Sequence, residues 1–266
     1  MTLAICATPI GNLDDVTLRV LAELREADVV LAEDTRHTRG LLRRHGIEAK
    51  LLSYHEHNEA ARVAELVPRL AAGERVALVS DAGLPGISDP GGRLVRAALD
   101  AGVAVSVLPG ASAVETALVA SGLVSERYAF VGFLPRRPGE LAALWEELAG
   151  WHWPVVAFES PQRLGAALRS LAAVTPERDV VVCRELTKKF EEVVRGTASS
   201  LAERYAKPPK GEITLVFGPA EPAPRGDEAA AAVAELVTAG TPRKVAVEVV
   251  ARLADMSRNE LYRGSL

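Results

Sequence analysis

Three loops, each following a short apolar run, contain the residue types best suited to binding a small molecule. The loop at residues 8–15 reads TPIGNLDD, and the loop at residues 80–92 reads SDAGLPGISDPGG. Glycines let a ligand approach backbone amides closely, and the second loop adds the carboxylates Asp81 and Asp89. A thirteen-residue connection without regular structure is unusual in a compact domain. A binding role for the second loop is therefore favoured over a solvated turn.

The third loop begins with LPGAS, residues 108–112, and leads into a predicted helix. Its Ser112 could cap that helix or meet a ligand with its hydroxyl. The first loop lacks the three-glycine dinucleotide fingerprint and the Gly-Lys-Ser/Thr of a P-loop, so a nucleotide phosphate site is not supported. Taken alone, that first loop is interpreted equally well as an ordinary turn. Three such loops after strands nevertheless predict one small-molecule site at a sheet edge.

Charged residues gather in the segment AEDTRHTRGLLRRHG at residues 32–46. Helical spacing from Thr35 places Arg36, Arg39 and Arg43 on one face. A second polar segment, SYHEHNEA, follows at residues 53–60. These side chains are interpreted as a polar rim that faces either solvent or substrate.

No metal site is expected. Four of the five histidines lie between residues 37 and 57, but none has the paired spacing on a helix that metal ligands use. Cys6 and Cys183 lie far apart in separate apolar runs, so we interpret them as buried reduced thiols rather than a disulfide or zinc ligands.

The composition is that of a globular protein, with 266 residues of which 48% are hydrophobic and 25% charged. The formal net charge of −4 excludes a generally basic nucleic-acid binder but permits a local basic face. No apolar run approaches the roughly 20 residues that span a bilayer, and the N-terminal segment lacks the pattern of a secretory signal. We therefore expect a cytoplasmic protein with no membrane contact.

The elements that would position these loops alternate between strand and helix, which predicts an α/β fold with a mostly parallel first sheet. In the first half, strands are predicted at residues 3–7, 29–32, 50–53, 75–79 and 103–108, and helices at 17–27, 35–45, 59–72 and 92–101. A break in the third of these helices is possible at Pro68.

The second half continues this pattern but with shorter connections. Strands are predicted at residues 128–133, 155–158, 180–183, 191–195 and 212–217, and helices at 113–121, 139–148, 162–173 and 199–206. The connections around Cys183, Val193 and Leu215 are too short for parallel crossovers, so some of these strands should pair antiparallel.

Four segments are expected along the chain. They are an N-terminal α/β lobe at residues 1–110, a C-terminal α/β lobe at 111–218, a proline-rich linker at 219–227 and a small helical domain at 228–266. Within the last segment, helices are predicted at residues 228–237, 246–254 and 259–262.

Taken together, the motifs resemble the tetrapyrrole methylase superfamily, most closely its branch of bacterial 16S rRNA cytidine 2′-O-methyltransferases. The resemblance rests on TPIGNL with DVTLR, AEDTRHT, YHEHNE, ALVSDAGLPGISDPG, LPGAS, FESPQRL, CRELTKKFEE and KGE, which occur in the order of that family. It covers residues 3–217, and the tail resembles the small helical domain that follows in many members.

This resemblance implies a two-lobed fold with S-adenosylmethionine in the cleft between the lobes, and a homodimer. Matched residue by residue, the implied cofactor contacts are Pro9, Ile10, Asp81, Gly83, Leu84, Ser112, Ala113, Phe158, Glu159, Leu186, Gly211 and Ile213. The sequence departs from the family where Leu84 stands for the commoner Thr, Ala111 for Pro and Gln162 for His. The first two leave backbone contacts possible, whereas Gln162 offers no ionisable group.

The implied reaction is 2′-O-methylation of a cytidine ribose in 16S rRNA, free or within the 30S subunit. A sulfonium methyl is already electrophilic, so alignment of the attacking oxygen matters most and no metal is needed. A ribose hydroxyl is a weak nucleophile, and a general base should assist it. The candidates for this base are Glu33, Asp34, His37 and Glu185, and the candidates for RNA phosphate contacts are Arg36, Arg39, Lys188 and Lys189.

Two other functions stay open. A tetrapyrrole-precursor methyltransferase would share the cofactor site, although the polar segments AEDTRHT and YHEHNE favour RNA. A non-enzymatic nucleic-acid-binding regulator is suggested only by the tail TPRKVAVEVVARLADMSRNELYR, whose spacing is like that of a helix-turn-helix. A regulator would not need the three cofactor loops.

Overall fold

The computed structural model describes residues 3–220, 225–254, 256–258 and 261. Its first sheet is entirely parallel, with strand order β3-β2-β4-β1-β5. The strands are β1 (Leu3–Cys6), β2 (Val29–Ala32), β3 (Leu51–Ser53), β4 (Val76–Val79) and β5 (Val105–Leu108). Strands β1, β2 and β4 are short apolar runs buried along their whole length, as expected for a parallel sheet covered on both faces.

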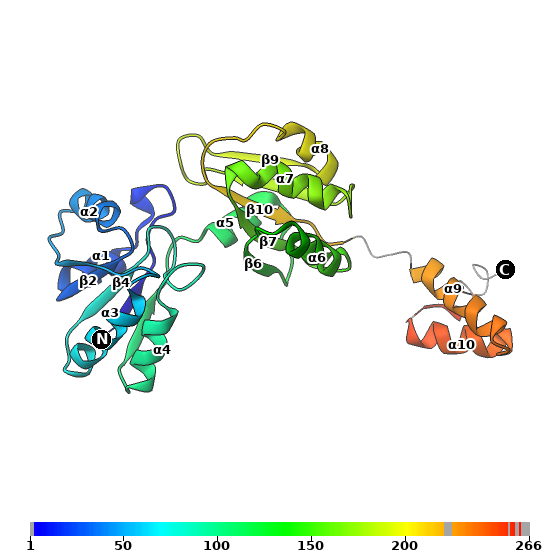
Figure 1. Ribbon diagram of the computed structural model, residues 1–266, viewed down its shortest axis with the longest axis horizontal. Helices are drawn as coiled ribbons and strands as arrows, with labels where there is room; N and C mark the ends of the chain where they lie inside the picture. The colour runs from blue at the N-terminus through cyan, green and yellow to red at the C-terminus, as the bar shows by residue number, and fades with distance from the viewer. Residues whose placement is uncertain (1–2, 221–224, 255, 259–260, 262–266) are drawn as a thin grey trace.

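Helices cover both faces of this sheet (Figure 1). They are α1 (Leu18–Glu26), α2 (Thr35–Arg44), α3 (Glu59–Ala71) and α4 (Gly92–Asp100). Alternate side chains of β1 pack into different clusters, Leu3 and Ile5 with residues of α3 and α4, and Ala4 and Cys6 with residues of α1 and α2. No break occurs at Pro68: α3 continues through it to Ala71, because Leu66 and Leu70 on either side are buried in the core and hold this turn in place.

The second sheet is mixed, with strand order β6-β7-β10-β8-β9. Only β6 and β7 pair in parallel; β10 is antiparallel to β7 and β8, and β8 is antiparallel to β9, which confirms the antiparallel pairing predicted from the short connections. The strands are β6 (Ala129–Phe133), β7 (Val155–Glu159), β8 (Asp179–Arg184), β9 (Glu192–Thr197) and β10 (Ile213–Phe217).

Helix α5 (Ala113–Ser121) packs on one face of this sheet, against Val156, Val181 and Val216. The other face is covered by α6 (Pro138–Ala149), α7 (Pro161–Ala172) and α8 (Ala198–Arg204). The chain leaves the first sheet at Leu108 and enters α5 at Ala113, so it passes from one lobe to the other at the third loop. The α/β fold and its two lobes are therefore as predicted.

Helices α9 (Arg225–Thr238) and α10 (Arg243–Leu253) pack against each other around Val233 and Val247, and lie apart from both sheets in Figure 1. Helix α9 begins at Arg225, inside the segment predicted as a linker, and residues 221–224 of that segment lie outside the described residues. Most of the helix predicted at 259–262 also lies outside them. Within the described residues, no helix is long and apolar enough to cross a membrane.

Candidate functional site

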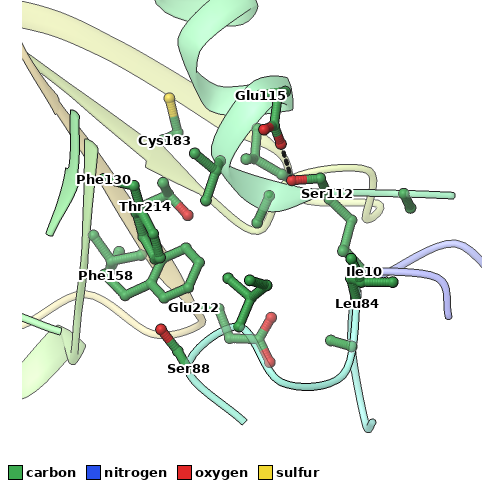
Figure 2. Close-up of a pocket in the computed structure, with 18 of the residues that line it drawn as sticks. Ile10, Leu84, Ser88, Ser112, Glu115, Phe130, Phe158, Cys183, Glu212 and Thr214 are labelled. Carbon is green, nitrogen blue, oxygen red and sulfur yellow. Dashed lines mark hydrogen bonds between the residues drawn. The ribbon is translucent and has the colours of Figure 1, made fainter. Parts of the chain in front are cut away.

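A cavity of about 830 Å³ lies where the loops that follow β4 and β5 face the second sheet (Figure 2). Both lobes line it. The first lobe and the crossing segment contribute Ile10, Asp81, Ala82, Gly83, Leu84, Ile87, Ser88, Asp89 and residues 109–115. The second lobe contributes Tyr128, Phe130, Phe133, Phe158, Glu159, Ser160, Pro161, Cys183, Leu186 and residues 211–214. The cavity therefore forms at the carboxyl ends of parallel strands, where α/β sheets bind ligands.

The first two loops are tied together by backbone hydrogen bonds. The N–H of Thr8 donates to the carbonyl of Gly83 over 2.8 Å, and the N–H of Gly83 donates back to Thr8 over 3.0 Å. The Thr8 hydroxyl also donates to the carbonyl of Ser80 over 3.0 Å. Gly83 adopts a φ of +79°, which a residue with a side chain rarely tolerates. The backbone conformation therefore explains why a glycine stands at position 83 in this site.

In the third loop, the Ser112 hydroxyl does not cap α5, although Ser112 occupies the N-cap position. It donates instead to the Glu115 carboxylate, which also accepts from the Tyr128 hydroxyl over 2.7 Å (Figure 2 shows the bond between Ser112 and Glu115). Burial raises the pKa of Glu115, but these two hydrogen bonds outweigh it and leave the pKa below its usual range. Glu115 is therefore an ionised group in the cavity wall.

The second lobe supplies an aromatic wall. Phe158 makes edge-to-face contacts with Phe130 and Phe133, with ring centroids 5.0 and 5.5 Å apart. In the same wall, on β8, Cys183 is buried and reduced as predicted, and burial raises its thiol pKa to about 11. An uncharged thiol and three aromatic rings make this side of the cavity apolar.

One carboxylate in this wall is fully buried. The Glu159 side chain has 0% exposure, and its Oε1 accepts from the N–H of Ser160 over 2.6 Å. Its Oε2 lies 3.2 Å from the Arg163 guanidinium but makes no hydrogen bond, and burial raises the pKa of Glu159. The Arg163 cation therefore compensates a buried carboxylate behind the cavity wall.

Of the twelve positions predicted as cofactor contacts, eleven line this cavity: Ile10, Asp81, Gly83, Leu84, Ser112, Ala113, Phe158, Glu159, Leu186, Gly211 and Ile213. Pro9 does not. It lines a small neighbouring pocket together with His37 and Asp81. Asp81 faces both spaces and links the cavity to the start of α2.

The four predicted base candidates lie beside the cavity rather than on its wall. Asp34 caps α2 by accepting from the N–H of Arg36 over 2.8 Å and pairs with the Arg36 side chain at 3.1 Å. These hydrogen bonds from Arg36 hold the pKa of Asp34 at about 2, so its carboxylate is a weak base. Its backbone N–H donates to Asp81 over 3.1 Å, which gives Asp34 a positioning contact.

Glu33 and His37 differ in their surroundings. Glu33 is half-buried at the end of β2; burial, then the negative charge of Asp81, raises its pKa, and His55 opposes this. His37 is exposed on α2, at the small pocket. Neither side chain lines the large cavity, although Glu33 is close enough to Asp81 for their charges to interact.

Glu185 and Lys188 form an ion-pair network in the loop between β8 and β9. The Lys188 ammonium lies 2.9 Å from Glu185 and 2.9 Å from Glu212, and only 27% of its side chain is exposed. Burial lowers the pKa of Lys188, but these carboxylates outweigh it and raise the pKa. Lys188 therefore holds this loop to Glu212, the residue that precedes β10. Its neighbour Lys189 is exposed.

The same loop touches the first lobe at Gly11. A Cβ placed on Gly11 would lie 2.5 Å from Lys188 Cγ and 2.7 Å from the carbonyl of Leu186. Only glycine permits this approach. On the other side, the loop that contains Gly11 is joined to α2 by the Arg44–Asp14 ion pair at 3.0 Å. Arg36 and Arg39 are exposed on α2, and Lys189 is exposed on the loop between β8 and β9. Both of these elements contact the loop that contains Gly11.

The sequence did not identify several cavity residues. Tyr128, Phe130 and Phe133 lie in and next to a strand whose pattern predicts only structure, and no signal in their types marks them as ligand contacts. Asp89 was recognised as a loop acid without a role, yet it lines the cavity. Burial, then the charge of Glu33, raises the pKa of Asp89 to about 6. Among the described residues, no group of three or more potential ligands is placed to hold a metal ion.

Comparison with known proteins agrees with this fold. Residues 2–202 match the tetrapyrrole (corrin/porphyrin) methylases, and the chain belongs to that family. It is 41% identical to a protein of Streptococcus pyogenes serotype M1 named ribosomal RNA small subunit methyltransferase I, over 98% of this chain and 93% of that protein. A protein of the same name from Mesorhizobium japonicum is 44% identical, over 98% of this chain and 90% of that protein.

A solved structure supports the fold. The uroporphyrin-III C-methyltransferase of Thermus thermophilus, complexed with S-adenyl homocysteine, has a TM-score of 0.57 and 18% identity. The match covers 81% of this chain and 97% of that protein. The family predicted from the motifs is thus confirmed.

Proposed function

We propose that this protein transfers a methyl group from S-adenosylmethionine to the 2′-hydroxyl of a cytidine ribose in 16S rRNA. The observation that carries this proposal is the cavity between the lobes, which gathers eleven of the twelve positions that match the family's cofactor contacts. The names of relatives at 41% and 44% identity support ribosomal RNA as the substrate. Such a substrate agrees with the cytoplasmic location expected from the sequence.

The cavity residues fit S-adenosylmethionine in chemistry. The molecule carries positive charge on its sulfonium and amino groups, and Asp81, Asp89 and the ionised Glu115 offer negative charge to them. Its adenine is flat and apolar on its faces, which suits the aromatic wall around Phe158.

When bound, S-adenosylmethionine supplies an electrophilic methyl on a positively charged sulfur. The chain's own contribution is to hold the ribose hydroxyl in line with that methyl and to exclude water from the cavity. The first two loops are suited to this positioning because the paired Thr8 and Gly83 hydrogen bonds fix their relative placement. Rigid loops lower the entropy lost when the reacting atoms are brought together.

The RNA would approach along the basic rim, which we define as Arg36, Arg39, Lys188 and Lys189. Within this rim, Arg36 pairs with Asp34 and Lys188 pairs with two glutamates, so Arg39 and Lys189 offer the more available charges. Beside Lys189, the Phe190 ring is 66% exposed and could stack on an unpaired base. Local positive charge of this kind reconciles an acidic chain with a polyanionic substrate.

The homodimer implied by the family resemblance is part of this proposal. The strand β5 lies at the edge of the first sheet, and its Val107 is exposed. Val119 on α5 and Val124 just after it are also exposed apolar residues that a partner could cover. Sedimentation of the full chain as a monomer at micromolar concentration would contradict this part of the proposal.

The substrate class is tested by supplying methyl-labelled S-adenosylmethionine together with purified 30S subunits, protein-free 16S rRNA or uroporphyrinogen III. We expect label in RNA and none in the tetrapyrrole. Label in the tetrapyrrole would support a tetrapyrrole-precursor methyltransferase, the second function left open by the sequence. Binding of RNA without any transfer, under conditions where S-adenosylmethionine is bound, would support the non-enzymatic regulator.

A further inference from the structure

We propose that Asp89 is the proton acceptor for the ribose hydroxyl, an inference that rests on the proposed function. Asp89 lines the cavity, whereas none of the four acids and bases chosen from the sequence does so. It follows β4 in the loop that also carries Asp81, Gly83 and Leu84, so it belongs to a segment that holds three of the predicted cofactor contacts.

The backbone around Asp89 is fixed on both sides. Ser88 adopts a φ of +61°, a conformation that a non-glycine residue holds only when its surroundings enforce it. The Ser88 side chain lines the cavity (Figure 2). It reaches the second lobe, where a Cβ placed on Gly132 in β6 would lie 3.7 Å from its Oγ. On the other side, the N–H of Gly91 donates to the buried Glu59 carboxylate over 3.1 Å. Asp89 is thus held in place before substrate arrives.

The electrostatic surroundings suit a proton acceptor at neutral pH. Burial is the main cause that raises the Asp89 pKa to about 6. The carboxylates of Glu33, at the end of β2, and Asp81, at the end of β4, raise it further, while a hydrogen bond with Ser80 lowers it. His55 acts on this group indirectly, because it lowers the pKa of Glu33. A carboxylate with a raised pKa binds a proton more strongly than an exposed aspartate and is still ionised at pH 7.

The other candidates are less suited. The pKa of Asp34 is held at about 2 by its hydrogen bonds with Arg36. Hydrogen bonds from the Glu212 backbone and from Lys188 lower the pKa of Glu185 and occupy its Oε1. Glu33 does not line the cavity. Its negative charge raises the pKa of Asp89, so we assign it an indirect role that acts through Asp89.

Atoms and electrons balance in the proposed step. The ribose 2′-oxygen forms a bond to the methyl carbon, and the carbon–sulfur bond breaks with its electron pair passing to sulfur. The hydroxyl proton passes to the Asp89 carboxylate and leaves to solvent after the methylated product departs. No other reactant is needed: the sulfonium becomes a neutral thioether, and its positive charge leaves as the proton that Asp89 releases to solvent.

The experiment compares wild-type protein with Asp89→Asn, Glu33→Gln and a matched control, Asp100→Asn. Asp100 is an exposed acid at the end of α4 that pairs with Arg96 and does not line the cavity. Three quantities are measured: the pKa of Asp89 from the side-chain carboxyl ¹³C shift in the protein alone, S-adenosylmethionine affinity by calorimetry, and kcat/KM on 30S subunits as a function of pH.

In the wild type we expect Asp89 to titrate near pH 6 and kcat/KM to fall as pH drops through that value, because the acceptor must be deprotonated. Asp89→Asn should reduce transfer by about 100-fold or more while S-adenosylmethionine still binds. Glu33→Gln removes a negative charge, so it should move both the Asp89 titration and the acid limb to lower pH. Asp100→Asn should change none of the three.

Two results would overturn the assignment. In the first, Asp89→Asn loses S-adenosylmethionine affinity but keeps full transfer when that ligand is saturating, which would make Asp89 a ligand contact only. In the second, the acid limb does not move in Glu33→Gln although the carboxyl titration does. If wild-type protein binds S-adenosylmethionine but methylates no RNA, the proposed function itself fails, and this outcome is distinct from both.

Discussion

At the scale of single residues, Asp81 connects the two spaces on either side of the first two loops. Its carboxylate lines the large cavity and the small pocket, and accepts the backbone N–H of Asp34 over 3.1 Å. Asp81 therefore both faces the proposed ligand and fixes the start of α2. A change at Asp81 should therefore weaken ligand binding and also loosen the start of α2.

We predict that Asp81→Ala weakens S-adenosylmethionine binding by roughly 10- to 100-fold, because a hydrogen bond or contact to a charged group contributes about 1.5–3 kcal/mol. Asp81→Asn keeps an oxygen that can accept from Asp34 but lacks the charge, so it should fall between the alanine variant and the wild type. Calorimetry measures all three proteins. Equal affinity in the alanine variant and the wild type would remove Asp81 from the site.

The residue scale is also where the sequence is least informative. The types of Glu33, Asp34 and His37 qualify each of them as a base, but residue type does not reveal which side chain faces a cavity between two lobes. That depends on contacts between segments distant in sequence, such as Asp34 with Asp81. The aromatic wall escaped prediction for the same reason, because Phe130 and Phe133 in β6 have the pattern of ordinary strand residues.

At the scale of elements, the sequence is more informative. The strands and helices of both lobes were predicted to within a few residues, because buried parallel strands are short apolar runs and the helices begin and end at capping residues and glycines. The short connections around Cys183 and Leu215 also predicted the antiparallel pairs of the second sheet. The break considered at Pro68 was wrong, because the buried Leu66 and Leu70 on either side of it keep α3 continuous.

The loop between β8 and β9 is held to β10 by close packing at Gly211. This glycine has a φ of +98°, and a Cβ there would lie 2.4 Å from Glu185 Cγ. Gly73 has a similar φ of +93° with nothing within 4 Å of a Cβ, which makes it a matched control. The two glycines have similar positive φ angles, but a Cβ would clash with a neighbouring side chain at Gly211 and not at Gly73.

We predict that Gly211→Ala destabilises the protein by more than Gly73→Ala, for which strain alone should cost about 1–3 kcal/mol. Because Gly211 lines the cavity, its variant should also bind S-adenosylmethionine more weakly, whereas the Gly73 variant should bind normally. Urea denaturation and calorimetry measure the two effects. Indistinguishable variants would show that the packing of Glu185 against Gly211 contributes nothing.

The basic rim belongs to the scale of elements because its parts lie on α2 and on the loop between β8 and β9. We predict that Arg36→Ala with Arg39→Ala lowers RNA affinity and flattens its dependence on salt. The slope of log affinity against log salt should change by about 0.7–0.9 for each phosphate that the variant no longer neutralises. Arg39 should contribute more than Arg36, whose charge already pairs with Asp34.

The rim prediction is checked by salt titrations of RNA binding, with Arg96→Ala as the control. Arg96 is exposed on α4 and pairs with Asp100. S-adenosylmethionine affinity should be unchanged in the double variant, since neither arginine lines the cavity. A salt slope equal to that of the wild type would place the RNA surface elsewhere, with Arg243 and Lys244 at the start of α10 as the next region to test.

At the scale of the whole molecule, two sheets with different strand patterns enclose one cavity, and neither lobe forms it alone. Gly11, at the contact between the lobes, allows this arrangement, because it approaches Lys188 and Leu186 more closely than any side chain would permit. The acidic residues of the cavity suit a positively charged ligand, whereas the exposed cations of the basic rim suit a polyanionic substrate. In the proposed reaction, the atom that receives the methyl group is the 2′-oxygen of a cytidine ribose.

The identity of this atom is tested by digesting 16S rRNA to nucleosides after reaction with the enzyme. The methylated product is then identified by mass spectrometry. The substrate should be 30S subunits that lack the modification, and Asp89→Asn protein provides the background. One 2′-O-methylcytidine per subunit is expected with wild-type protein, and almost none with the variant. A cytidine methylated on its base, or a methyl group on another nucleoside, would contradict the proposed reaction.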